Sequence, residues 1–146
     1  MPSAYFFCNT CHKKYPTHQR LFDTLYNFQR MNPEHCPECG EARELRLSLD
    51  FQLGYGDEEF KIVSAFLPAQ LESWLGEEEE GVTFYPFLVV MERVGDGKQF
   101  CWMPYWHVTG KGARYGQHAV CMDRTQFESL MVQAREKTPT KVLEFV

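Results

Sequence analysis

Hydrophobic and polar positions alternate along residues 45–53, LRLSLDFQL, where an apolar side chain stands at every second position. A period of two is typical of a strand with one buried face. Residues 82–94 and 98–108 are rich in β-branched and aromatic side chains and flank Asp96-Gly97. An Asp-Gly pair between two such runs predicts a β-hairpin.

Two prolines interrupt this predicted hairpin, Pro86 in its first arm and Pro104 in its second. Proline has no backbone N–H to donate within a sheet, so both are expected at strand edges or bulges. Residues 60–67, FKIVSAFL, fit a strand or a helix. A short apolar run of this kind does not distinguish the two.

Three segments carry apolar residues at helical spacing. Residues 21–31 predict a short helix. Pro68 suits the first turn of a second helix, which Gly76 would end and whose apolar face would hold Leu71, Trp74 and Leu75. Asp123, followed by Gln126, resembles a capping box that opens a third helix. Its apolar face would contain Phe127, Leu130, Met131 and Ala134, and residues 141–146 would form a closing strand.

This pattern predicts an α+β protein in which an N-terminal unit joins a small antiparallel sheet with one or two packed helices. The turn at 54–57, GYGD, divides the 146 residues into an N-terminal unit with an inserted helix, 1–53, and an α+β domain, 54–146. Residues 76–81, GEEEEG, are expected to form a solvated acidic loop.

Charge is unevenly distributed along the chain. The formal net charge is −5, and residues 51–95 carry two cations against nine anions. Only residues 96–146 lean basic, with seven cations and five anions. Proteins that bind duplex nucleic acid usually present a strong basic face, so that function is disfavoured. The sequence contains no run of 18 apolar residues, so it predicts no membrane-spanning helix.

Six cysteines are the clearest chemical signal. The N-terminus shows no basic region followed by an apolar stretch, so the chain is expected to be cytoplasmic, where paired cysteines favour metal over disulfides. Cys8-x2-Cys11 and Cys36-x2-Cys39 are separated by 24 residues. Two tight turns of this kind supply four thiolates and close a tetrahedral Zn²⁺ shell, although iron fits the same ligands. A closed shell leaves no position for a catalytic water, so the ion should be structural. The N-terminal unit, 1–53, is therefore predicted to be a zinc ribbon that joins the antiparallel sheet.

The same segment resembles a known family. Met-Pro at the start, aromatic residues before Cys8, an aromatic residue four positions after Cys11 and the CPECG turn are similar to an FmdB-type zinc ribbon. The resemblance covers about the first third of the chain. It implies the four metal ligands and a regulatory role. The family usually has glycine at the position of His12, which implies a backbone φ that histidine adopts less freely. His12 and His35 adjoin the knuckle cysteines, either as exposed turn residues or as hydrogen-bond donors to sulfur.

The segment CWMPYWHVTGKGARYGQHAVC, 101–121, admits three interpretations. Its aromatic residues could pack a sheet core. They could instead form a binding surface with neighbouring cations, made of Trp102, Trp106, His107, Lys111, Arg114 and Tyr115. Finally, Cys101, His107, His118 and Cys121 have enough ligands for a second metal site, or for an enzyme centred on His107, His118 and Cys121.

No catalytic sequence motif accompanies these residues, so the prediction is a non-enzymatic binding or regulatory module that acts through protein contacts. Aromatic residues beside arginine are typical of protein interfaces. The first alternative is a nucleic-acid-binding accessory protein that uses the aromatic and basic residues of this segment. The second alternative is the enzyme.

Overall fold

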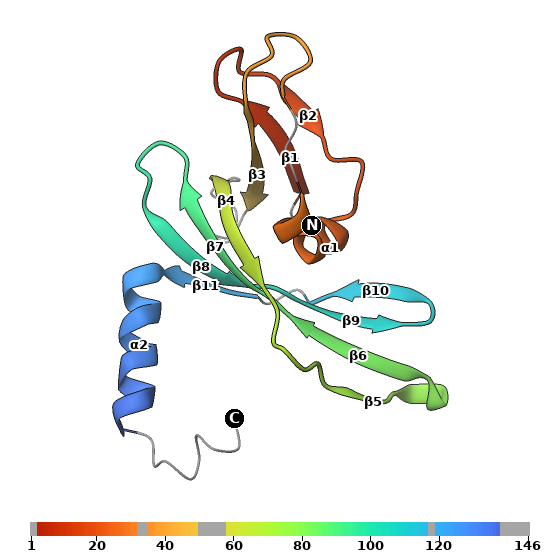
Figure 1. Cartoon of the computed structure of the whole chain (residues 1–146). Coiled ribbons are helices and arrows are strands. Elements are labelled where there is room, and N and C mark those ends of the chain that lie inside the picture. Colours follow the sequence, from red (N-terminus) through yellow and green to blue (C-terminus); the bar gives the residue numbers. More distant parts are fainter. Residues whose placement is uncertain (1–2, 32–34, 50–57, 117–118, 138–146) are drawn as a thin grey trace.

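The computed structural model of the protein describes residues 3–31, 35–49, 58–116 and 119–137. Two antiparallel sheets dominate it, which confirms the predicted α+β class (Figure 1). The seven-stranded sheet has the order β11 (Val120–Asp123), β8 (Gln99–Met103), β7 (Leu88–Arg93), β4 (Glu58–Phe66), β3 (Arg43–Leu49), β1 (Ser3–Cys8) and β2 (Lys14–Pro16). The four-stranded sheet has the order β10 (Gly112–Tyr115), β9 (Tyr105–Thr109), β6 (Gly81–Pro86) and β5 (Ser73–Leu75).

One long bent hairpin supplies strands to both sheets. Its inner parts, β7 and β8, pair in the seven-stranded sheet, and its outer parts, β6 and β9, pair in the four-stranded sheet. Pro86 ends β6, and the buried Pro104 separates β8 from β9. At this bend the Phe87 N–H donates to the Pro104 carbonyl across 2.9 Å. The prolines thus mark the passage from one sheet to the other, because neither can donate within a ladder.

The Asp96-Gly97 turn closes the hairpin between β7 and β8, as predicted. Gly97 has a φ of 70°, and the Asp96 carboxylate accepts a hydrogen bond from the Lys98 N–H at 3.1 Å. The sequence run 60–67, which fitted a strand or a helix, lies mostly in strand β4.

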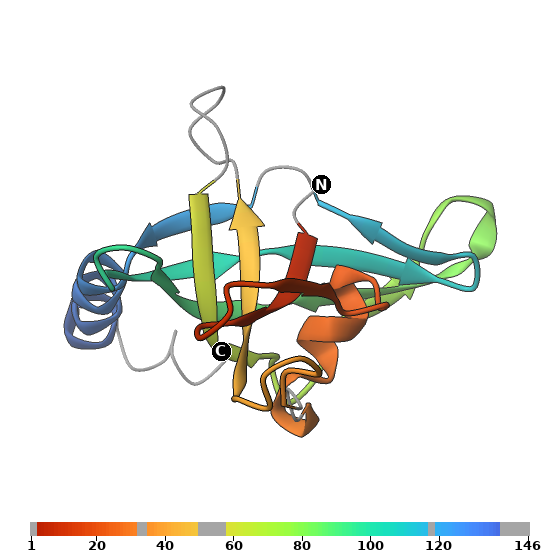
Figure 2. The same ribbon diagram turned by 90° about the horizontal axis from the view of Figure 1, so that it is seen from above.

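A continuous sheet joins the two segments that the sequence divides at 53/54. Strand β3 pairs with β4 antiparallel, from Arg46 opposite Lys61 to Leu49 opposite Glu58. Side chains from both segments form one hydrophobic core, which includes Leu25, Leu47, Phe60 and Val89. Residues 54–57, where the boundary was predicted, lie outside the described residues. Viewed from above, the N-terminal strands run across the long hairpin (Figure 2).

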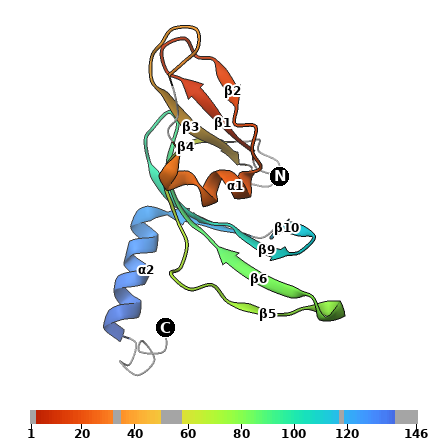
Figure 3. The same cartoon turned by 45° about the vertical axis from the view of Figure 1, so that its right-hand side comes forward.

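The predicted helix at 21–31 is confirmed as α1 (Leu21–Tyr26) followed by the 3-10 helix η1 (Phe28–Arg30). Helix α1 buries Leu21 and Leu25 in the shared core. Its Phe22 ring lies 5.6 Å from the ring of Trp106 on the four-stranded sheet. Helix α1 therefore ties the N-terminal strands to the second sheet (Figure 3).

The predicted helix at 68–76 is wrong. Its last part forms strand β5, which pairs with β6 through Trp74 opposite Val82, and no helix is described between 68 and 76. Both Trp74 and Leu75 are exposed rather than buried on a helical face. The acidic run that follows contains the exposed 3-10 helix η2 (Glu77–Glu79).

The C-terminal helix α2 (Arg124–Lys137) begins directly after Asp123, as predicted. Asp123 Oδ1 accepts hydrogen bonds from the backbone N–H groups of Thr125 and Gln126, at 2.7 and 3.4 Å. The predicted packing of its apolar face is only slight, because Leu130 and Met131 are 54% and 44% exposed. The strand predicted at 141–146 lies outside the described residues. None of the described helices has the length and apolar character needed to cross a membrane.

Candidate metal centre

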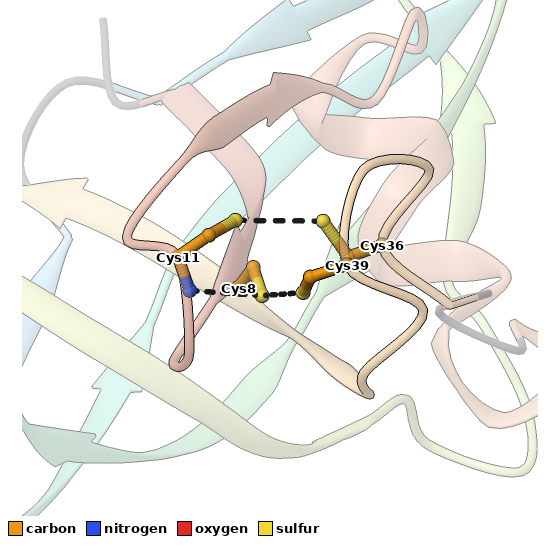
Figure 4. A group of neighbouring side chains, drawn as sticks. All are labelled: Cys8, Cys11, Cys36 and Cys39. Atoms are coloured by element: carbon orange, nitrogen blue, oxygen red, sulfur yellow. Dashed lines mark hydrogen bonds between the residues drawn. The ribbon is translucent and has the colours of Figure 1, made fainter.

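The four cysteines of the two predicted knuckles converge at one point (Figure 4). Cys8 Sγ lies 3.4 Å from Cys39 Sγ, and Cys11 Sγ lies 3.5 Å from Cys36 Sγ. All four sulfur atoms lie within 4.8 Å of one another. These distances are far longer than the roughly 2.05 Å of a disulfide bond, and all four thiols are free.

The spacing of the sulfur atoms fits a bound metal ion. A tetrahedral zinc site with Zn–S bonds of about 2.3 Å places its sulfurs roughly 3.8 Å apart. The observed separations lie close to this value and come from four separate side chains. The four sulfur atoms are therefore close enough together to hold one metal ion.

Both knuckles have the same backbone geometry. In the first, His12 N–H donates to the Cys8 carbonyl at 2.8 Å, and in the second, Gly40 N–H donates to the Cys36 carbonyl at the same distance. His12 and Gly40 occupy equivalent positions, with φ values of 61° and 75°. Left-handed backbone costs an L-residue more than it costs glycine, so the first knuckle keeps its turn at the expense of strain.

Hydrogen bonds stabilise two of the thiolates. The Tyr15 hydroxyl lies 3.1 Å from Cys36 Sγ and is the leading cause that lowers the pKa of Cys36 to about 6. The Cys11 N–H donates to Cys8 Sγ at 3.5 Å and leads the causes that lower the pKa of Cys8. Ligation requires deprotonated sulfur, so both interactions favour metal binding near neutral pH.

Charged side chains surround the site. Lys13 forms an ion pair with Glu38, which links the first knuckle to the second. Arg43 stacks on Tyr15, with its guanidinium carbon 5.1 Å from the ring centroid. A four-thiolate site with a divalent ion carries a net charge of −2, so neighbouring cations reduce its repulsion.

Neither knuckle histidine is seen to donate to sulfur within the described residues. His12 is exposed and its ring lies 6.0 Å from that of Phe7. His35 is also exposed and forms an isolated antiparallel bridge with Ala42. Their placement agrees with the interpretation as exposed turn residues.

The six residues predicted as a binding surface divide into a buried and an accessible group. Trp102 and Trp106 are 3% and 2% exposed, so the surface interpretation is wrong for both tryptophans. Tyr115 packs beside Trp106, 5.1 Å between ring centroids, and is half-buried. Burial leads the causes that raise the pKa of Tyr115. These three side chains belong to the core.

His107, Lys111 and Arg114 remain accessible and lie close together. Arg114 on β10 stands directly opposite His107 on β9, and Lys111 lies in the turn between these strands. All three line one open cleft of about 570 Å³ at the end of the four-stranded sheet. Three of the six residues predicted as a binding surface are thus accessible and lie side by side.

The second metal site is not formed by the described cysteines and histidine. Cys101 and Cys121 lie in the seven-stranded sheet and His107 in the other, and among described residues the knuckle cysteines are the one group of three or more potential ligands. Burial raises the pKa of Cys121 to about 12. His118, which completes the proposed enzyme site, lies outside the described residues.

Two contacts at the candidate sites are not evident from the sequence. Tyr15 stands out only as the aromatic residue four positions after Cys11, yet its hydroxyl lies beside Cys36 Sγ. Trp74 is predicted on one face of a helix, yet it lies on a strand and lines the cleft with His107. The three-residue strand that carries Trp74 is too short for a periodic signal.

No protein-family model, curated protein or solved structure matches the chain. The similarity to FmdB-type ribbons therefore stays a prediction.

Proposed function

We propose that the chain is a non-enzymatic binding and regulatory module of the cytoplasm, whose four cysteines hold a structural Zn²⁺ ion. The observation that carries the proposal is the convergence of Cys8, Cys11, Cys36 and Cys39 at distances suited to tetrahedral ligation. Four protein ligands saturate such an ion, so its contribution is to folding rather than to chemistry.

The position of the site indicates what the ion stabilises. Cys8 ends β1, and Cys39 precedes β3. Every residue of β1 pairs with a residue of β3. The ion would therefore hold the adjoining ends of β1 and β3 together, near one edge of the seven-stranded sheet. The N-terminal strands hold α1, and α1 in turn packs against the sheet that carries the cleft.

Protein contact is the favoured mode of action. The chain has a net charge of −5, and the accessible cleft combines aromatic and charged side chains from two hairpins and from Arg20, which precedes α1. Aromatic residues and arginine are enriched where proteins bind one another. A second candidate, binding of single-stranded nucleic acid, is favoured by the partly exposed rings beside Arg114.

Elemental analysis of the purified protein tests the metal part of the proposal. We expect about one equivalent of zinc per chain, lost in Cys36→Ser and retained in the matched control Cys121→Ser. Iron in place of zinc would support the structural role of the site and would change only the identity of the bound ion. Less than about half an equivalent of either metal would contradict the proposal.

Recovery of binding partners from the native host tests the contact part. The tagged metal-loaded protein and a Cys8→Ser variant are compared after chemical cross-linking. We expect to recover a partner protein whose binding to the metal-loaded chain is saturable and whose binding to the Cys8→Ser variant is weaker. Recovery of nucleic acid instead would favour the second candidate, and no saturable partner would contradict the proposal.

A further inference from the structure

A cluster of four rings lies on the face of the four-stranded sheet opposite the core. We call Trp74, Phe84, Tyr105 and His107 the outer ring cluster. His107 is at its centre, with ring-centroid distances of 5.7 Å to Trp74, 5.5 Å to Phe84 and 5.8 Å to Tyr105. Trp74 is 46% exposed, and the other three are partly exposed.

Strand register explains why these rings share a face. Phe84 stands opposite His107, and His107 stands opposite Arg114, so the three side chains form a row across β6, β9 and β10. Residues one position along, such as Tyr85 and Trp106, point to the other face and pack against Phe22 of α1. The core therefore takes one face of the sheet and leaves the outer ring cluster without a covering element among the described residues.

The cleft beside the outer ring cluster has both signs of charge on its walls. Lys111 and Arg114 come from the β9–β10 hairpin, and Glu77 and Glu80 come from the β5–β6 connection. Arg20, directly before α1, also lines the cleft and is paired with Asp23 at 3.3 Å. Among the residues that the structure describes, Arg114, Glu77 and Glu80 form no ion pair, and Lys111 reaches Glu78 only at 3.9 Å. These charges are available to a ligand.

The distribution of charge discriminates between ligand classes. A nucleic-acid strand presents phosphates along its whole length, and the acidic connection at residues 77–80 would repel those near it. A peptide can place a basic side chain near Glu77 and Glu80 and an acidic one near Arg114. The exposed Trp74 ring lies on the acidic side and can also receive a cation on its face.

We propose that this cleft binds an extended peptide segment of a partner protein, with a basic and an acidic side chain flanking an apolar one. The basic side chain lies between Trp74 and Glu80, the acidic side chain pairs with Arg114, and the apolar one covers His107. The inference rests on the proposed function and assigns its contact surface. The metal centre lies at another end of the molecule and takes no direct part (Figure 1).

Nuclear magnetic resonance of the three tryptophan indole N–H groups tests the proposal in the full zinc-loaded chain. Trp102 and Trp106 are buried and serve as internal references, and Trp74→Phe assigns the third resonance. The probes are capped peptides with the cores KLE, KLLE and KLLLE, compared with KLLK and ELLE peptides and with oligothymidine. We expect saturable movement of the Trp74 resonance with a mixed-charge peptide and none of the other two.

Charge reversal then locates the two ends of the peptide. Arg114→Glu and Glu80→Lys should each weaken binding by about fivefold or more, which is typical of a contact at a desolvated interface. Arg135→Glu on α2 is the matched control and should leave binding unchanged, because it reverses an exposed charge away from the cleft. Preference for oligothymidine would reassign the cleft to nucleic acid. Equal binding of all peptides, or of none, would overturn the proposal.

Failure of this inference can be distinguished from failure of the proposed function. If cross-linking recovers a protein partner whose binding survives Trp74→Ala and Arg114→Glu, the contact lies elsewhere and only the assignment of the cleft fails. If no partner saturates the metal-loaded chain, the proposed function fails regardless of the peptide result.

Discussion

The hydroxyl of Tyr15 lies 3.1 Å from the sulfur of Cys36 and joins strand β2 to the second knuckle. This contact reaches across 21 residues of sequence. It leads the causes that hold the pKa of Cys36 at about 6, well below the ordinary 9.0 of a thiol.

Replacement of Tyr15 by phenylalanine should weaken metal binding. A lowered thiol pKa stabilises the folded protein fully above the unfolded pKa, and this contribution is lost as pH falls from about 9 to about 6. Tyr15→Phe raises the pKa of Cys36, so more metal is displaced by protons at neutral pH. We expect about tenfold lower zinc affinity and a higher pH midpoint of zinc release, measured with a chromogenic chelator. Tyr26→Phe, away from the sulfurs, is the control. Identical midpoints would show that the contact is not energetically coupled to the metal.

The six thiols should react in two groups. With metal bound, we expect slow modification by Ellman's reagent. On chelation, the four knuckle thiols react first. Cys101 and Cys121 follow slowly, because they lie on the paired strands β8 and β11 rather than in turns that the metal holds, and desolvation also raises the pKa of each. Cys101→Ser with Cys121→Ser should remove the slow phase and leave the fast phase intact. Fast reaction of Cys101 or Cys121 in the metal-bound protein would contradict this arrangement.

Two tryptophans of the four-stranded sheet, Trp106 on β9 and Trp74 on β5, should differ sharply in their contribution to stability. Trp106 is 2% exposed and contacts Phe22, Phe87 and Tyr115. Trp106→Ala should lower the free energy of unfolding by about 3–5 kcal/mol. Trp74→Ala removes a half-exposed ring and should cost less than about 1 kcal/mol. Urea unfolding of the zinc-loaded chains measures both, and equal losses would show that the two faces are assigned wrongly.

Glycine at position 12 should stabilise the first knuckle. His12 has a φ of 61°, and relief of this strain should raise the free energy of unfolding by about 0.5–1 kcal/mol, after the entropy cost of glycine. The matched change in the second knuckle, Gly40→Ala, should destabilise, although a Cβ there meets no atom within 4 Å. Thermal unfolding at fixed zinc concentration measures both variants. If His12→Gly instead lowers the free energy of unfolding, the contacts of the histidine side chain stabilise the protein by more than the strained backbone at position 12 destabilises it.

Local chemistry made parts of this molecule predictable. The cysteine spacing places four ligands together, Asp96-Gly97 closes the hairpin between β7 and β8, and Asp123 caps α2. Each single knuckle, the Asp96-Gly97 turn and the Asp123 cap depend on a few consecutive residues whose backbone geometry is set by their own side chains. The two knuckles come together because a metal ion needs all four thiolates.

The features that the sequence did not reveal depend on long-range pairing. Trp74 shows no strand periodicity within three residues, and only its partner Val82 on β6 makes the segment a strand. Trp102 and Trp106 are four positions apart, so strand alternation places both on one face, and Phe100, Trp102, Pro104 and Trp106 are all buried. Alternation groups these side chains on one face of the chain, but it does not say whether that face is covered by the rest of the protein, because the covering residues, such as Phe22, are distant in sequence.

The bent hairpin also determines how the molecule can be dissected. Because β6 and β9 continue directly into β7 and β8, any fragment that carries the cleft also carries the central strands of the other sheet. A truncation that isolates the cysteine knuckles would strip β3 of its neighbour β4, and one that isolates the cleft would expose the edge of β7. Mapping of partners by deletion would therefore report misfolding rather than recognition, and point substitutions in the intact chain are the appropriate tool.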